Sequence, residues 1–267
     1  MRIIRITLVI IIISISLPLL TSCQRPSASI IVAGSTSVQP YVEMLAEEYA
    51  IIFPGKVVDV QGGGSSAGIT AVVSGTADIG MASRNLRESE DHLLVVEIAK
   101  DGLAIIVHPK NSLSDLTLEQ IRGIYMGEYT NWSQLGGENA RIHVIAREEG
   151  SGTRSAFEEM AMDGNRIIPR AIILNSNGAV RQSIAGDPHS IGFISLGLVD
   201  IGESPVKALR IDGIEPLLEN VATGSYAMYR SFLFVMLEEP QGPILDFIDF
   251  VRSPEGQRIL ALEGLVT

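Results

Sequence analysis

The sequence contains a single cysteine, Cys23, among 267 residues. No disulfide can therefore form within one chain. Basic residues are also scarce, since 20 Lys and Arg stand against 31 Asp and Glu and the formal net charge is −11. The absence of a basic stripe disfavours nucleic acid as a partner. His, Cys, Asp and Glu do not gather at metal-ligand spacing, so neither a metal nor a cofactor is expected.

Long apolar runs are lacking except at residues 6–20, a stretch too short for a confident membrane span. Two arginines precede it, so residues 1–22 are expected to be an export signal outside the fold. Residues 20–23 read LTSC, the pattern of a bacterial lipobox, in which the cysteine becomes the lipidated first residue of the mature protein. The sequence thus predicts a lipid anchor at Cys23, a tether at 23–29 and a place on the extracytoplasmic face of the cell membrane. An ordinary signal peptide with an incidental cysteine is the alternative.

Gly, Ser and Thr are concentrated in short loops between strand-like and helix-like segments. Within residues 142–160, Arg147 ends a β-forming stretch, Gly150-Ser151-Gly152-Thr153 follows, and good helix formers come next. Glycines let the backbone approach a ligand, and a Ser or Thr cap leaves N–H groups and hydroxyls at the positive end of the helix. Arg147 adds a planar fork of donors suited to two oxygens of one anion. This segment predicts an anion site, with a capped turn beside a surface arginine as the plainer interpretation.

Two more such units lie in the first third of the chain. Gly34-Ser35-Thr36-Ser37 separates a predicted strand at 30–33 from a predicted helix at 39–49, and residues 61–68 follow a predicted strand at 57–60. A further strand, at 77–82, ends in Ser83-Arg84. Ligands of open α/β sheets bind at the carboxyl ends of the strands, so we expect these loops to face one site.

The rest of the chain alternates strand-like and helix-like segments, which argues for parallel α/β sheets. The expected strands are 103–107, 142–145, 191–194, 206–211 and 230–237, and the expected helices are 116–125, 154–160, 179–185, 243–252 and 254–261.

Six segments, in order, resemble those of the PstS-type phosphate-binding lipoproteins of bacterial phosphate ABC importers. They are AGSTSVQP, QGGGSSAGI, ADIGMASR, LTLEQIRGIYMGEYTNWSQLGG, REEGSGTRSAFE and SIGFISLG. The resemblance covers essentially everything after Cys23. It implies a type II periplasmic-binding-protein-like fold of two α/β lobes with a ligand cleft between them. Residues 30–107 plus about 225–267 would form lobe 1, and residues 108–224 lobe 2.

The same resemblance implies a monomeric solute-binding protein, not an enzyme, that captures inorganic phosphate and delivers it to the permease subunits of an ABC importer. Carried over residue by residue, the phosphate contacts would be Thr36, Ser37, Ser65, Ser83, Arg84, Arg147, Ser151, Gly152 and Thr153.

One departure from the family concerns Arg84. Many members have an aspartate there, which accepts the proton of hydrogen phosphate and thereby rejects sulfate. An arginine cannot accept a proton, and Glu148, Glu149 and Asp78 are the possible substitutes. Pointing into the cleft, Arg84 would favour dianions; it could equally turn to solvent or pair with Glu88.

Two other functions compete with phosphate binding. The first is binding of another tetrahedral oxyanion, such as sulfate, molybdate or tungstate, since helix ends and hydroxyls hold all of them. The second is a serine hydrolase, because residues 64–68 fit G-x-S-x-G around Ser66. The hydrolase is the weaker hypothesis, since His108, His143 and His189 do not stand in a recognisable acid–histidine loop.

Overall fold

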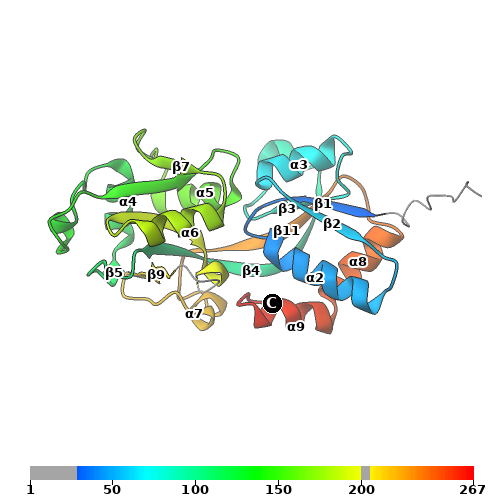
Figure 1. Cartoon of the computed structure of the whole chain (residues 1–267). Coiled ribbons are helices and arrows are strands. Elements are labelled where there is room, and N and C mark those ends of the chain that lie inside the picture. The colour runs from blue at the N-terminus through cyan, green and yellow to red at the C-terminus, as the bar shows by residue number, and fades with distance from the viewer. Residues whose placement is uncertain (1–28, 200–204) are drawn as a thin grey trace, which may run out of the picture.

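Two α/β bodies joined by long strands make up the protein (Figure 1). The computed structural model describes residues 29–199 and 205–267, so the expected signal peptide, Cys23 and nearly all of the tether lie outside the described residues. We call one body the first lobe; its elements are β1 (Ile30–Gly34), α2 (Gln39–Ile52), β2 (Val58–Gly62), α3 (Ser65–Val73), β3 (Ile79–Ala82), α8 (Pro243–Arg252) and α9 (Pro254–Leu262).

The other body is the second lobe. Its main elements are α4 (Leu118–Met126), β6 (His143–Arg147), α5 (Gly152–Phe157), β7 (Ile172–Leu174), α6 (Asn177–Gly186) and β8 (Ser190–Ser195). Shorter ones are β5 (Asp115–Leu116), β9 (Lys207–Ala208), β10 (Arg210–Ile211) and α7 (Leu218–Ala222).

Strands β4 (Leu94–Val107) and β11 (Tyr229–Met236) connect the two lobes. The main sheet runs in the order β2-β1-β3-β11-β4-β8-β6-β7. Residues 94–102 of β4 pair antiparallel with β11, and residues 103–107 pair antiparallel with β8. One continuous strand therefore belongs to both lobes, and β11 fills the place between β3 and β4.

Hydrophobic periodicity explains how the helices sit on this sheet. In α2 the buried residues Tyr41, Val42, Leu45 and Tyr49 recur at helical spacing, so one face packs inward while the other stays in water. A large core lies around β1, β3, β11 and α2, and a second core surrounds Trp132, Phe157 and Phe193 in the second lobe. Helices α8 and α9 pack on α2, so the C-terminal segment contacts the first lobe.

Most expected elements are present, but three differ. The strand expected at 103–107 is the second half of β4, which begins at Leu94. The first half lacks a continuous apolar run, because Glu97, Lys100 and Asp101 lie in it, and so the sequence does not reveal it. The strand expected at 206–211 is two short strands that pair with different partners, β4 and β5. The helix expected at 154–160 begins at Gly152 and continues after Phe157 as a π-helical turn, Glu158–Met162.

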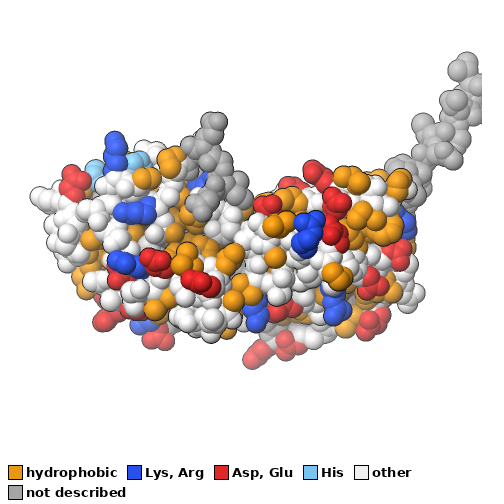
Figure 2. Space-filling model, turned by 90° about the horizontal axis from the view of Figure 1, so that it is seen from below, with side chains coloured by type: hydrophobic (Ala, Val, Ile, Leu, Met, Phe, Trp, Pro, Cys, Tyr) orange, Lys and Arg blue, Asp and Glu red, His pale blue; other side chains and the backbone are white. Residues whose placement is uncertain are grey.

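The residue limits of the two lobes stay a prediction, since β4 and β11 belong to both bodies. Figure 2 shows a notch between the lobes and, on that face, Lys and Arg side chains scattered among acidic ones. Among the helices in the described ranges, none has the length and apolar character needed to cross a membrane.

Candidate anion-binding site

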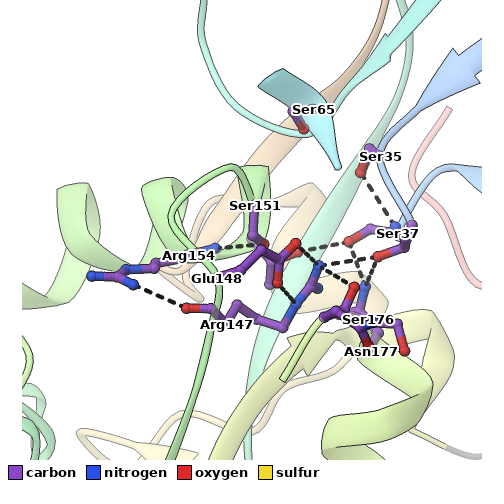
Figure 3. Close-up of polar contacts among 12 residues, drawn as sticks. Ser35, Ser37, Ser65, Arg147, Glu148, Ser151, Arg154, Ser176 and Asn177 are labelled. Carbon is purple, nitrogen blue, oxygen red and sulfur yellow. Dashed lines mark hydrogen bonds and ion pairs between the residues drawn. The ribbon is translucent and has the colours of Figure 1, made fainter. Parts of the chain in front are cut away.

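Polar side chains from both lobes meet where strands end and helices begin (Figure 3). From the first lobe come residues 35–37 between β1 and α2, Ser65 at the start of α3, and Ser83 after β3. From the second lobe come Arg147 at the end of β6 and residues 151–153 at the start of α5. The carboxyl-end placement expected from the sequence is thus what the fold produces.

The first-lobe serines form a buried chain of hydrogen bonds. Ser35 Oγ donates to Ser83 Oγ at 2.8 Å, and the Ser83 backbone N–H donates to Ser65 Oγ at 3.1 Å. All three residues are buried. Because each hydroxyl is fixed by a neighbour, their orientations are set before any ligand arrives.

The two lobes touch directly at this point. Ser37 Oγ and Thr153 Oγ1 are 2.8 Å apart, and the Ser66 N–H donates to Gly150 O at 3.2 Å. A Cβ atom placed on Gly152 would lie 2.1 Å from Ser65 Oγ, closer than van der Waals contact allows. Glycine at 152 is therefore what lets the α5 loop approach the first lobe.

Arg147 is buried at this contact with its side chain 1% exposed. Its Nε and Nη2 each donate to one oxygen of Glu148, both at 2.9 Å, and Nη2 also donates to Thr36 Oγ1 at 3.2 Å. Nη1 has no partner among the described residues. A buried guanidinium nitrogen without an acceptor is a donor available to an anion.

Arg84 lines a pocket of about 320 Å³ between the lobes, together with Arg230 of β11. The Arg84 side chain neither turns to solvent nor pairs with Glu88. Its Nη1 and Nη2 donate to the two carboxylate oxygens of Glu90 at 2.7 and 2.9 Å. These hydrogen bonds lower the pKa of Glu90. The charge of Arg84 is thus paired with Glu90. Arg84 therefore does not supply the unpaired positive charge that the sequence analysis considered as a means of favouring dianions.

The three proposed replacements for the family aspartate lie in different places. Glu148 faces the site and pairs with Arg147. Asp78 accepts a hydrogen bond from the Ile31 N–H near the start of β1, away from the loops of the site, and Glu149 is exposed. Only Glu148 of the three therefore has its carboxylate among the site residues.

Sequence reasoning missed three residues that the structure brings into the site. Asn177 Nδ2 donates to Ser37 Oγ at 2.9 Å, and Arg230 Nη2 donates to the same oxygen at 3.0 Å. Arg230 also donates to Asp101 Oδ2 at 3.0 Å, and both residues are buried. A signal exists for Arg230, which is the one charged residue of β11, whereas β4 also contains Glu97 and Lys100 and so does not single out Asp101.

Burial raises the pKa of Asp101, and the Arg230 guanidinium opposes that rise. Ser195 Oγ donates to the other Asp101 oxygen at 2.7 Å. Among the described residues, Nη1 of Arg230 has no partner, and the same holds for Nη1 of Arg147. The site therefore combines hydroxyls and two guanidiniums with free donors, which is chemistry for binding oxygen anions.

Among the described residues, no histidine forms a hydrogen bond with Ser66 Oγ, as the hydrolase hypothesis would require. Ser66 Oγ accepts from Arg84 Nη2 at 3.4 Å. His143 pairs with Asp187, His189 lies near Glu138, and His108 Nδ1 accepts from the Lys110 N–H. These three histidines thus have their contacts elsewhere in the described chain.

Comparison with known proteins identifies the family. A model described as a PBP superfamily domain matches residues 21–255. The phosphate-binding protein PstS of Bacillus subtilis is 30% identical over 244 residues, which cover 90% of this chain and 80% of that protein. The chain belongs to the PstS-type phosphate-binding proteins of the PBP superfamily. The family expected from the six segments is thereby confirmed.

Solved structures agree with this assignment. A putative phosphate ABC transporter substrate-binding protein from Clostridium perfringens, crystallised with bound phosphate, has a TM-score of 0.86 and 41% identity over 90% of this chain and 99% of its own. An ABC-type phosphate transport receptor from Vibrio cholerae has a TM-score of 0.74 and 37% identity, covering 89% and 99% of the two chains. The predicted periplasmic-binding-protein-like fold of two α/β lobes is confirmed.

Proposed function

We propose that this protein captures inorganic phosphate between its two lobes and hands it to an ABC importer. The observation that carries the proposal is the meeting of hydroxyls from both lobes around Arg147, a buried arginine with a free Nη1 donor. Such donors fit the four oxygens of a tetrahedral anion. The names of the Bacillus subtilis relative and of the two solved structures support phosphate as that anion.

The proposed contacts are those expected from the sequence, with Ser83 and Arg84 modified in role. Thr36, Ser37 and Ser65 on one side and Arg147, Ser151, Gly152 and Thr153 on the other would surround the ligand. Ser83 would act by fixing Ser35 and Ser65. Arg84, paired with Glu90, would shape the cleft wall rather than supply free charge.

The setting of this activity is part of the same proposal. The protein would be a monomer without enzymatic activity, anchored by a lipid on Cys23 at the extracytoplasmic face of the cell membrane. There it would meet the permease subunits of the importer. A lipobox after a short apolar run is the feature that supports the anchor.

Isothermal titration of the chain lacking residues 1–23 tests the function. Phosphate, sulfate and molybdate would each be titrated at pH 8 and at pH 5.5. We expect phosphate to bind most tightly at pH 8. Tighter binding of sulfate or molybdate would mean that this oxyanion, and not phosphate, is the ligand. No heat of binding with any of the three would refute an oxyanion-binding function. Labelling of Ser66 by a fluorophosphonate would instead indicate a hydrolase.

A further inference from the structure

The end of the first lobe that lies away from the second lobe carries exposed apolar side chains (Figure 1). They are Ile51 and Ile52 at the end of α2, Phe53 directly after it, and Val57 just before β2, with exposed fractions of 72%, 42%, 43% and 44%. We call these four residues the apolar tip. Every residue from 50 to 55 is exposed, so the turn between α2 and β2 projects from the lobe. Figure 2 shows hydrophobic side chains gathered at this end.

The periodicity of α2 does not account for the tip. The solvent face of this helix carries Glu43 and Glu47, which are four residues apart and exposed, and the next position on that face is Ile51. A third glutamate would continue the polar face, but an isoleucine occupies the position and is the most exposed residue of the tip. Contiguous exposed apolar side chains mark a contact surface.

The tip is held in place before anything covers it. The Phe53 ring packs on the rings of Tyr49 and Phe250, with centroid distances of 4.9 and 6.4 Å. The Lys56 N–H donates to Phe53 O at 3.1 Å, and Lys56 Nζ pairs with Asp246 Oδ2 at 3.3 Å. Because these contacts already fix the turn, little further ordering is needed when a partner binds.

The chain enters the fold at the tip. The Ile30 N–H donates to Val57 O at 2.9 Å, and Ile30 is the parallel partner of Val58. Cys23 lies seven residues before Ile30, and seven residues span at most about 25 Å. A lipid on Cys23 would therefore keep the tip within this distance of the membrane, at an effective concentration on the order of millimolar.

From this placement we propose that the apolar tip rests in the surface of the membrane to which Cys23 is anchored. The inference rests on the lipid anchor of the proposed function and adds a second point of contact. Aliphatic and aromatic side chains enter the boundary between lipid headgroups and acyl chains. Since the tip lies at the end of the molecule opposite the second lobe, this contact holds the second lobe away from the lipid (Figure 1).

The charges around the tip favour an apolar contact over an electrostatic one. The chain has a net charge of −11, and the exposed Glu47 and Asp59 lie about 6 to 7 Å back from the tip along α2 and β2. The charge of Lys56 is paired with Asp246. Attraction to anionic headgroups is therefore weak, and the contact depends on burial of apolar surface, which neutral and anionic lipids offer alike.

Brominated lipids test the contact in the full chain, lipidated at Cys23 and reconstituted into phosphatidylcholine vesicles. Phe53→Trp supplies the reporter, and the native Trp132, buried in the second lobe, gives the background emission. The emission added by the Phe53→Trp side chain should shift to the blue and fall about twofold or more with lipids brominated near the headgroup. It should fall less with bromine near the methyl end, because interfacial side chains enter only about 5 to 10 Å.

Matched variants separate the tip from other exposed apolar residues. Ile173, on β7 of the second lobe, is 50% exposed, and Ile173→Trp should show no quenching. In the reporter protein, Ile51→Glu continues the row of glutamates and should abolish the quenching, whereas Ile173→Glu should leave it unchanged. Phosphatidylglycerol in the vesicles should not increase the quenching. Thermal melting verifies that each variant is folded.

Several outcomes would overturn the membrane contact. They are an unquenched Phe53→Trp, equal quenching of Ile173→Trp, quenching that survives Ile51→Glu, and quenching that requires phosphatidylglycerol, which would assign the contact to Lys56. A blue shift without quenching would mean that protein covers the tip. A shift that grows with protein density would indicate a second copy, and one that does not would indicate residues 24–29.

The proposed function is measured separately. Phosphate titration of Ile51→Glu should match the wild type, because the tip lies away from the anion-binding loops. A chain that carries no lipid on Cys23 would refute the anchor and this inference together. Loss of phosphate binding in the wild type would refute phosphate capture and leave the quenching result as it stands.

Discussion

Replacing Arg147 should weaken phosphate binding more than any other single change at the site. Its guanidinium is held by Glu148 and Thr36, its Nη1 has no partner in the described part of the chain, and its side chain is 1% exposed. In Arg147→Met the ligand would lose a buried charge-assisted donor. The loss of a buried charged partner costs about 2 to 4 kcal/mol. This equals roughly a 30- to 1000-fold rise in the dissociation constant.

Arg147→Met should reduce the stability of the fold less than it reduces the affinity for phosphate. Glu148, left without its partner, has a side chain that is 30% exposed and can be hydrated. Titration at pH 8 would measure the affinity, and thermal melting the stability. Arg122→Met is the matched control, since Arg122 lies in the same lobe and contacts Ala161 O and Asp163 instead. A loss below threefold in Arg147→Met, or an equal loss in the control, would remove Arg147 from the site.

Three further predictions concern closure, acid stability and the anchor. Gly152→Ala would place its Cβ 2.1 Å from Ser65 Oγ and keep the two lobes apart, so phosphate affinity should fall about tenfold or more. The control Gly178→Ala, whose Cβ has its nearest neighbour at 4.0 Å, should bind phosphate normally. Equal affinities of the two variants would argue against the close approach of the lobes at Gly152. Arg84 lowers the pKa of Glu90 below 4.5, so the pair stabilises the fold above that pH and the stabilisation disappears as pH falls through the lowered pKa. Glu90→Gln should therefore lower the melting temperature at pH 7 by at least about 2 to 4 °C, and a gap as large at pH 3 as at pH 7 would contradict this. Cys23→Ala should release the protein from the membrane fraction or stall its processing; membrane association at the mature size would disprove the anchor.

The loops of the site could be predicted because their chemistry is local. Gly, Ser and Thr between a strand and a helix specify a turn, a cap and free donors within a few residues. The chain therefore shows Ser37, Ser65 and Ser151 as candidates before any tertiary structure is known. That Arg147 accompanies one of these loops is also visible, since it lies three positions before Gly150.

The pairing of the supporting residues Arg230 and Asp101 could not be predicted, because it depends on strand register. Arg230 and Asp101 are direct cross-strand partners in the β11–β4 pairing, although 129 positions separate them in the chain. Only the antiparallel alignment of those strands places a cation beside an anion there. The partner of Arg84 could not be predicted for a similar reason, since the turn Glu88–Glu90 brings Glu90, rather than Glu88, against the Arg84 guanidinium.

The position of β11 in the sheet also has a consequence for how the chain folds. Strands β3 and β4 are close in sequence, but their shared neighbour is made more than 120 residues after β4. Until residues 229–236 arrive, both strands keep an open edge in the middle of the sheet, and open edges invite pairing with other chains. The first lobe is thus begun first and finished last. A chain that ends between Thr153 and Tyr229 would be aggregation-prone, even though all three anion-binding loops are already made.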